Sequence, residues 1–555
     1  MQSGRTGEFA VALSGGGHRA TLFAIGALMA LVDRGLNRQV VQISSVSGGS
    51  IANAFVAQRC RFDQLDPGEL DPIAAELIGT IAERGVLSRL SIAVVTGGSI
   101  LIGLAVALVL WQLSVPSVFA VLVGLFLVAG ILLTSGLIVQ HLLDQRYFSP
   151  GRTSGKLGDL ADRTVEHVFC STDLVLGEPV HFSTWDGGTA WRMTGTGQAG
   201  RGPTSAGVRY EAKGLSLAEV VRASSAFPGI PPLRLRSDSA LGAPRRSPAR
   251  RRTGAPGAAE DLDVPVVRSG VLFLADGGLW NNLGSHVLRE HHILRGREAN
   301  DVGLPLLCVN SSAPGAASAR FVYSVPVLAQ VAALFRTLRV LTVNTVRPRV
   351  TAIADAMTRR NALGLRPGPR DPLDVVVDLT DVPRHEDTVR RVCVDRDDVR
   401  RSDPVHDRYR QDLVASLAAW ADQLQGAPSP SDSTQLSGFV LAALRGRPKG
   451  SDEGTGVLDR RTLEEVLVQP WWAAVRANAG GDDLAVPTTL SRVDRTSAAQ
   501  LVLRGYANTW LSSLLLDSHD AGAPPDDIVA RVRAMAGLPA APPPPVPATP
   551  APLWP

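Results

Sequence analysis

The chain of 555 residues has few cysteines, and Cys60, Cys170, Cys308 and Cys393 lie far apart. Without a Cys-x-x-Cys pair or a Cys/His cluster at metal-ligand spacing, neither a zinc module nor a disulfide framework is supported. Lysine is scarce too, and a net charge of +4 is small for this length, so the composition carries no nucleic-acid footprint. We therefore expect no metal, no cofactor, no nucleic-acid partner and a reducing cytoplasm.

One long segment contains no charged residues: from Ser91 to Gln140 there is no Asp, Glu, Lys or Arg. It divides at 112–117 into two apolar runs, each long enough to cross a hydrocarbon core about 30 Å thick. Arginines flank both ends, and no signal peptide precedes the segment, which places both flanks in the cytoplasm. We therefore expect a transmembrane hairpin over 91–140, integral to the cytoplasmic membrane, with the catalytic domain on the cytoplasmic side. Two helices buried in a protein core are the alternative.

The remaining chain alternates short apolar strands with helical periodicity. A strand at Phe9–Leu13 runs into a glycine-rich turn, and apolar residues then recur at three- and four-residue spacing until Gly35. A second strand at Val40–Ile43 leads through a Ser/Gly turn into another helical stretch, which is the α/β signature. Further strands are expected at 165–170, 180–183, 271–274, 304–309 and 375–379, and a last helix within 490–516 that packs on the sheet.

Low-complexity stretches punctuate the chain and give the expected domain organisation. A loop rich in Arg and Pro at 231–257 is expected either to contact anionic lipid headgroups or to be a solvated insertion. The expected parts are a first catalytic part at 7–90, the hairpin at 91–140, a second catalytic part at 156–312, an α/β extension at 313–425, a linker at 426–456, a helical region at 457–538 and a Pro-rich tail at 539–555.

Three short motifs carry the chemistry. Ser47 lies between a strand and a helix and is followed by glycines, so it fits a sharp elbow that exposes a nucleophilic hydroxyl; an ordinary turn is the alternative. Gly15, Gly16 and Gly17 open a helix and offer unobstructed N–H groups to a developing oxyanion. A phosphate-binding turn would instead need GK[ST] or GxGxxG, which this segment lacks. Asp276 ends an apolar strand and precedes two glycines.

Together these pieces resemble the patatin-like phospholipase family, with its GGGxR oxyanion motif, GxSxG elbow and DG[GA] aspartate. The similarity covers about residues 7 to 312, and a weaker echo is the LRGY of 503–506. Two departures are Ser45 in place of the first elbow glycine and Leu283 in place of the usual proline. The matching segments are Gly15-Gly16-Gly17-His18-Arg19, Ser45-Val46-Ser47-Gly48-Gly49, Asp276-Gly277-Gly278, CSTDLVLGEPVHF from Cys170, VRASSAFP from Val221 and Trp280-Asn281-Asn282.

The resemblance implies an α/β fold, a patatin-like α/β hydrolase-type sheet flanked by helices, here with the inserted two-helix transmembrane hairpin. It implies that Ser47 attacks an ester carbonyl, that Asp276 accepts its proton, and that the oxyanion is held by Gly15, Gly16, Gly17 and Gly48. Supporting positions are Arg19, Gly49, Gly277 and Gly278. Arg19 either braces the glycine loop or contacts a lipid phosphate, and His286 is either a third catalytic residue or a surface histidine.

The expected protein is a membrane-anchored serine acyl hydrolase that cleaves phospholipid or lysophospholipid esters through a Ser–Asp dyad and an acyl-enzyme. An isolated Asp with a pKa of ~3.9 is a weak base for a hydroxyl, so the dyad should be partly desolvated. A lipid acyltransferase with the same dyad and a catalytically inactive membrane scaffold remain open. The sequence indicates no headgroup preference and no oligomeric state.

Overall fold

The computed structural model describes the segments on which the following account rests. They are residues 8–86, 101–103, 105–106, 108–112, 118–119, 122–124, 136–148, 155–160, 164–175, 177–194, 206–226, 232–236, 245–246, 271–288, 305–311, 374–380, 382–392, 460–481, 486, 490–515 and 527–540.

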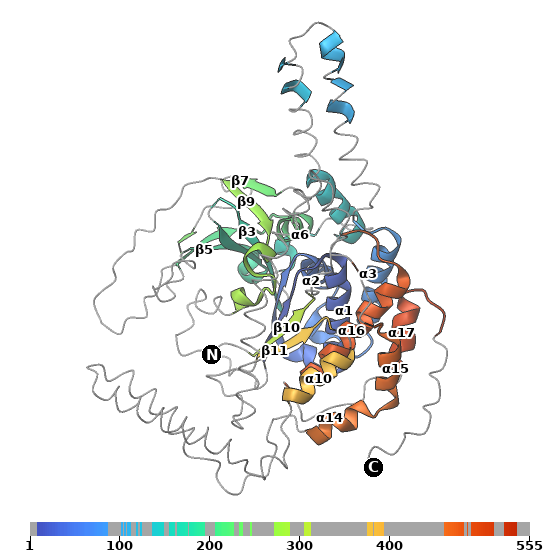
Figure 1. The fold of residues 1–555 in the computed structure, drawn as a ribbon. Helices are drawn as coiled ribbons and strands as arrows, with labels where there is room; N and C mark the ends of the chain where they lie inside the picture. Colours follow the sequence, from blue (N-terminus) through green and yellow to red (C-terminus); the bar gives the residue numbers. More distant parts are fainter. Residues whose placement is uncertain are drawn as a thin grey trace, which may run out of the picture.

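A mixed sheet forms the centre of the molecule (Figure 1). Its strands run in the order β11 (Asp374–Asp378), β10 (Leu306–Asn310), β1 (Phe9–Leu13), β2 (Val40–Val46), β3 (Glu166–Asp173), β4 (Glu178–Ser183), β5 (Thr189–Thr194), β6 (Ala206–Glu211) and β8 (Arg245–Arg246). The pairs from β11 to β3 are parallel, and those from β3 to β8 are antiparallel. Off this path, β9 (Val271–Asp276) pairs antiparallel with both β3 and β7 (Leu233–Arg236). Buried strands on both sides of β1 make the parallel half the core of the fold.

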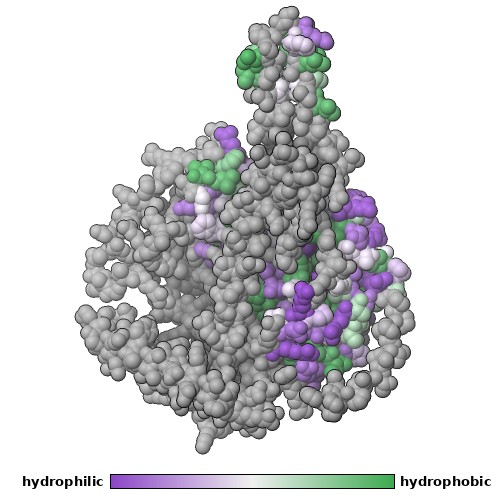
Figure 2. Space-filling view, in the orientation of Figure 1, coloured by the Kyte–Doolittle hydropathy of each residue, from purple (hydrophilic) through white to green (hydrophobic). Residues whose placement is uncertain are grey.

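Helices cover the sheet, and most lie to the right of it in Figure 1. They are α1 (Gly17–Asp33), α2 (Gly48–Arg59), α3 (Asp71–Glu83), α6 (Leu217–Ser224), α7 (Gly278–Asn281), α10 (Val382–Val392), α14 (Arg460–Leu467), α15 (Pro470–Asn478), α16 (Arg495–Ser513) and α17 (Ile528–Met535). The outer face over the C-terminal helices is mostly hydrophilic, as the purple residues at the right of Figure 2 show. The buried residues of α15 and α17 are apolar and lie on their inner sides, whereas α16 is buried along almost its whole length.

Two long helices from opposite ends of the sequence, α1 and α16, pack against each other in the core. A Cβ at Gly26 of α1 would overlap the carbonyl oxygen of Val502, and one at Gly505 of α16 would overlap that of Phe23. The two glycines therefore bring the helix backbones into direct contact. Asp494 begins α16 with a side chain that accepts the amide of Ser497 at 2.9 Å, as an N-cap should.

A part-buried ionic cluster joins the same helices at one end. Arg531 of α17 contacts Asp33 at 3.0 Å and Asp71 at 2.6 Å, and the hydroxyl of Tyr506 donates to Asp33 at 2.9 Å. Burial is the largest single effect on the pKa of Arg531 and lowers it. The hydrogen bonds and negative charges of Asp33 and Asp71 together outweigh burial, so the pKa lies above its usual value. The cluster links α17 to α1, α3 and α16.

The predicted transmembrane hairpin needs correction. Within 91–140 the structure describes only 101–103, 105–106, 108–112, 118–119, 122–124 and 136–140. In the described part of the chain, no helix combines the length and the apolar character needed to cross a membrane. The predicted hairpin and the predicted integral location in the cytoplasmic membrane are therefore wrong.

The described end of the apolar segment gives a physical reason for this error. Val139, near the end of the segment, is 5% exposed and belongs to the main hydrophobic core, as do Leu143 and Tyr147 just beyond it. Earlier in the segment, Leu101 and Val118 are 68% and 72% exposed. Apolar side chains are satisfied by contact with protein as well as by contact with lipid, so absence of charge alone does not separate the two environments.

Other predicted segments fall partly outside the description. Within the Arg/Pro-rich stretch 231–257, the structure describes 232–236 and 245–246, which contribute β7 and β8 to the sheet. The linker at 426–456 and the tail beyond 540 lie outside the described residues. Part of the predicted extension at 313–425 forms β11, which pairs with β10 in the same sheet as the catalytic motifs.

Candidate active site

Ser47 occupies a sharp turn between β2 and α2. Its φ of 51° makes it the only non-glycine residue with positive φ in the described part of the chain. Backbone conformations of this kind cost about 1–3 kcal/mol and cluster at functional positions. The amide of Ser47 lies 3.1 Å from the carbonyl oxygen of Ser224 and 3.0 Å from its hydroxyl, contacts that hold the turn. The local geometry is that of a nucleophile elbow.

The glycines after Ser47 are required by the neighbouring backbone. A Cβ at Gly48 would overlap the carbonyl oxygen of Gly17, and one at Gly49 would lie 2.7 Å from that of Leu13. The elbow therefore packs directly on the strand and turn that carry the glycine motif.

Ser45, one of the two departures from the motif pattern, is accommodated by a buried polar network. Its hydroxyl donates to the carbonyl of Val168 at 3.0 Å and accepts hydrogen bonds from Ser50 at 3.1 Å and Asn53 at 2.9 Å. The side chain thus has partners and does not disturb the elbow.

Strand β3 brings the candidate nucleophile and acid together. β2 pairs with the first part of β3, and its last pair is Val46 with Cys170. β9 pairs with the remaining part of β3, where Asp276 lies opposite Ser171. Ser47 directly follows Val46, so the end of β2, which is parallel to β3, meets the end of β9, which is antiparallel to β3. This places Ser47 beside Asp276, near enough for its side chain to lower the pKa of the Asp276 carboxyl.

Asp276 is buried, with 2% of its surface exposed. Its Oδ1 accepts the amide of Gly278 at 2.7 Å. Burial raises the pKa of Asp276 to about 6, against the opposing effects of the hydrogen bonds from Gly278 and Ser47. The carboxyl is therefore ionised at neutral pH and more basic than an exposed Asp, as a general base for a hydroxyl should be.

The aspartate turn also requires its glycines. A Cβ at Gly277 would overlap the carbonyl oxygen of Cys170, and one at Gly278 would lie 2.7 Å from the amide oxygen of Asn282. Leu283, the other departure from the motif pattern, donates its amide to the side-chain oxygen of Asn281 at 3.1 Å. Proline has no amide hydrogen and could not make this bond.

The glycine loop supplies fewer free amides than the motif alone indicates. Gly15 donates its amide to the carbonyl of Asn282 at 3.0 Å. Gly17 and Gly48 begin α1 and α2, where helix geometry leaves N–H groups without intrahelical partners. Gly16 and Gly17 have φ values of 151° and 62°, conformations that glycine adopts without strain. The candidate oxyanion donors are therefore the amides of Gly16, Gly17 and Gly48.

Arg19 donates to the carbonyl of Val486 at 3.1 Å and is 5% exposed. That geometry favours the bracing role over contact with a lipid phosphate. His286 packs edge-on against Trp280 at 6.2 Å between ring centroids and lines a small cavity beside Cys170 and His181. The described residues contain no group of three or more His, Cys, Asp or Glu side chains suited to a metal ion.

Two further residues, Ser224 and Asn282, support the site, although the motifs that contain them indicate no role for either. Ser224 holds the nucleophile turn and donates to the carbonyl of Cys170 at 2.6 Å. Asn282 binds the amide of Gly15 and so links the aspartate turn to the glycine loop. Contacts of this kind join residues hundreds of positions apart, which no local pattern reveals.

Comparison with known proteins gives a limited result. No family model and no curated protein matches the chain. Among solved structures, the chain is similar to VipD from Legionella pneumophila, with 13% sequence identity and a TM-score of 0.24, over 95% of this chain and 90% of that one. A similarity at this score carries no argument about function.

Proposed function

We propose that the protein is a serine acyl hydrolase acting on phospholipid or lysophospholipid esters. The observation that carries the proposal is the position of Ser47, on a turn with positive φ, beside the buried carboxyl of Asp276 at the same end of β3. The motif resemblance supplies the lipid ester as the substrate class, and the dyad geometry supports acyl transfer.

The proposed reaction uses only side chains and amides of this chain. Asp276 takes the Ser47 proton as the hydroxyl oxygen attacks the ester carbonyl, and the amides of Gly16, Gly17 and Gly48 bind the resulting oxyanion. The C–O bond to the alcohol then breaks, Asp276 returns the proton to the leaving oxygen, and the acyl group remains on Ser47. A water molecule, deprotonated by Asp276, releases the fatty acid by the same steps.

Labelling with a fluorophosphonate tests the nucleophile. We expect one adduct per chain, located by peptide mass spectrometry on Ser47 and absent from the nearby Ser45 and Ser50, because of these three serines Ser47 lies beside the carboxyl of Asp276. Heat-denatured protein is the control and should remain unlabelled. An adduct on another residue, or the same labelling after denaturation, would contradict the proposal.

Fatty-acid release from phosphatidylcholine and lysophosphatidylcholine by the purified protein tests the substrate class. Purified Ser47→Ala protein is the matched control. If the protein hydrolysed a short-chain ester but released no fatty acid from either lipid, the proposed dyad would stand and the assignment of lipid substrates would be excluded.

The pH dependence of hydrolysis follows from the raised pKa of Asp276. The free carboxylate is the base, so kcat/KM should rise with pH through about 6 and then level off, reporting the free enzyme. A soluble short-chain ester serves as substrate, since its own charge does not change in this range. A rate that stays constant down to pH 4.5 would exclude Asp276 as the base.

A further inference from the structure

His18, the first residue after the three glycines, is held by hydrogen bonds at both ring nitrogens. It is fully buried, with Nδ1 at 2.7 Å from the carbonyl oxygen of Ser491 and Nε2 at 2.9 Å from the hydroxyl of Tyr147. A carbonyl oxygen only accepts, so Nδ1 carries the proton and Nε2 accepts from Tyr147. Burial lowers the pKa of His18 to about 4, so the ring is neutral and has one tautomer.

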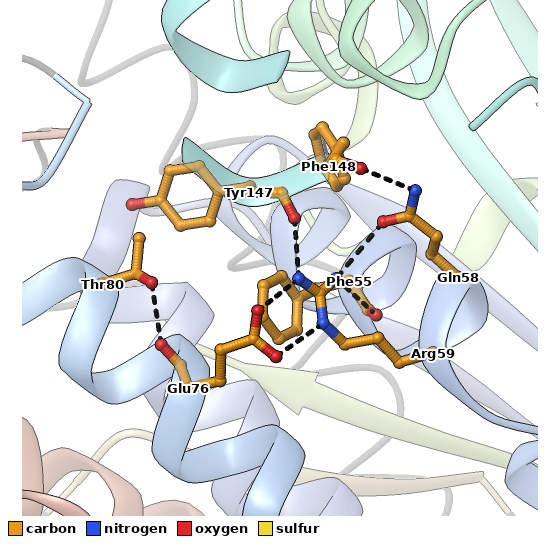
Figure 3. A network of polar contacts seen from close by, with 7 residues as sticks. All are labelled: Phe55, Gln58, Arg59, Glu76, Thr80, Tyr147 and Phe148. Atoms are coloured by element: carbon orange, nitrogen blue, oxygen red, sulfur yellow. Dashed lines mark hydrogen bonds and ion pairs between the residues drawn. The ribbon is translucent and has the colours of Figure 1, made fainter. Parts of the chain in front are cut away.

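Tyr147 is fixed to the helix that begins at the nucleophile. Arg59 of α2 donates to the carbonyl of Tyr147 at 3.0 Å and pairs with Glu76 of α3 at 2.7 Å. Gln58 donates to the carbonyl of Phe148 at 2.8 Å. Figure 3 shows these contacts, with the Tyr147 hydroxyl directed away from Arg59. The donor to His18 is therefore positioned by α2.

The other partner of His18 belongs to the segment that leads into α16. The carbonyl of Leu490 accepts the amide of Val86 at 2.8 Å, next to Ser491. Arg19 reaches the same part of the chain through the carbonyl of Val486. The residues that follow the glycines are thus held from α2 on one side and from the segment before α16 on the other.

The glycine loop needs such support, because glycine itself restricts the backbone least of all residues. Oxyanion stabilisation depends on donors that are already in place before the charge develops. On the side before the glycines, the hydroxyl of Ser311 donates to the carbonyl of Gly15 at 3.0 Å. Since Gly16 and Gly17 have no side chains, His18 is the nearest position on the other side from which a side chain can hold the loop.

We propose that His18, through Tyr147 and the Ser491 carbonyl, is a positioning residue that sets the direction of the Gly16 and Gly17 amides. This inference rests on the proposed function, because it assigns the loop to an oxyanion. Loss of the support should weaken binding of the transition state and leave binding of the substrate unchanged.

Tyr147→Phe tests the inference, with Tyr506→Phe as its matched control. Both variants remove one hydroxyl from a fully buried tyrosine and leave the ring in place; Tyr506 donates to Asp33, away from the glycine loop. Both should lower the unfolding temperature. Only Tyr147→Phe should lower kcat, by about tenfold, with KM unchanged within twofold.

His18→Phe provides a second measurement that does not depend on the tyrosine. It removes both hydrogen bonds, so kcat should fall at least as far as in Tyr147→Phe, and Tyr147→Phe added to it should have no further effect. The inference would be overturned if folded Tyr147→Phe kept its kcat, or if Tyr147→Phe and Tyr506→Phe lost kcat equally. The proposed function would still stand in either case, provided that Ser47→Ala is inactive. Full activity of Ser47→Ala would overturn both.

Discussion

Asp276→Asn should hydrolyse esters about 10⁴-fold more slowly than the wild type, at the level of Ser47→Ala. The asparagine can still accept the amide of Gly278, so the turn should keep its shape, but it cannot take the Ser47 proton. The double variant should be no slower than either single variant, because the two residues act as one unit. Steady-state rates on a soluble ester measure all three.

His286→Ala is the control for a dyad as opposed to a triad. His286 packs on Trp280, and Ser47 lies beside Asp276, so this variant should keep most of the activity. A folded but inactive His286→Ala protein would show that a histidine takes part in the proton transfer.

The same Asp276 substitution should increase stability at alkaline pH. The folded-state pKa of about 6 lies above the ordinary carboxyl value, so the native protein binds the proton more tightly than the unfolded chain and loses stability as pH rises through about 6. The ionised carboxylate costs on the order of 3 kcal/mol at pH 8. Asp276→Asn should therefore melt at a higher temperature than the wild type at pH 8, and the difference should disappear near pH 4.

Gly505→Ala should be strongly destabilising. The added Cβ would overlap the carbonyl oxygen of Phe23 and force α16 away from α1, at a cost of about 3 kcal/mol or more. The N-terminus of α1 carries the glycine loop, so a shift of about 1 Å should also reduce the rate roughly 10²-fold. Thermal unfolding and steady-state hydrolysis measure the two effects.

Gly79→Ala is the matched control for this prediction. Gly79 lies within α3, and a Cβ there meets no atom within 4 Å. Alanine favours the helix over glycine, so this variant should be more stable by about 0.5–1 kcal/mol and fully active. Equal stability of the two variants would mean that the α1–α16 contact is not tight.

Local patterns predicted the elements that surround the site. The strand expected at Phe9–Leu13 has these bounds in the structure, and the glycines of 15–17 open a helix as expected. These elements combine strong apolar character with an abrupt turn, so the sequence signal is clear over a few residues. The structure also places Ser47 and Asp276 within hydrogen-bonding reach, and their catalytic roles remain a prediction.

The remaining features depend on contacts distant in sequence. The strands β5 and β6 were missed, because mixed polar and apolar residues in short antiparallel strands resemble irregular chain. The hairpin prediction is wrong, since an absence of charge does not by itself set the length of a helix, and no described helix is long and apolar enough to cross a membrane. The last helix was expected to pack on the sheet; α16 does contact β11, and it also packs along α1. No sequence pattern within 490–516 indicates that this helix packs against α1.

The contact between α1 and α16 also fixes when the protein can become active during its synthesis. The two helices are separated by roughly 460 residues, which a ribosome translates in about 25–90 s at ~5–20 residues per second. Until α16 has left the ribosome, α1 lacks its main helical neighbour and His18 lacks the carbonyl of Ser491. If Ser47 is the nucleophile, the nascent chain carries it long before Ser491 can support the glycine loop, so we expect full activity only near the end of translation.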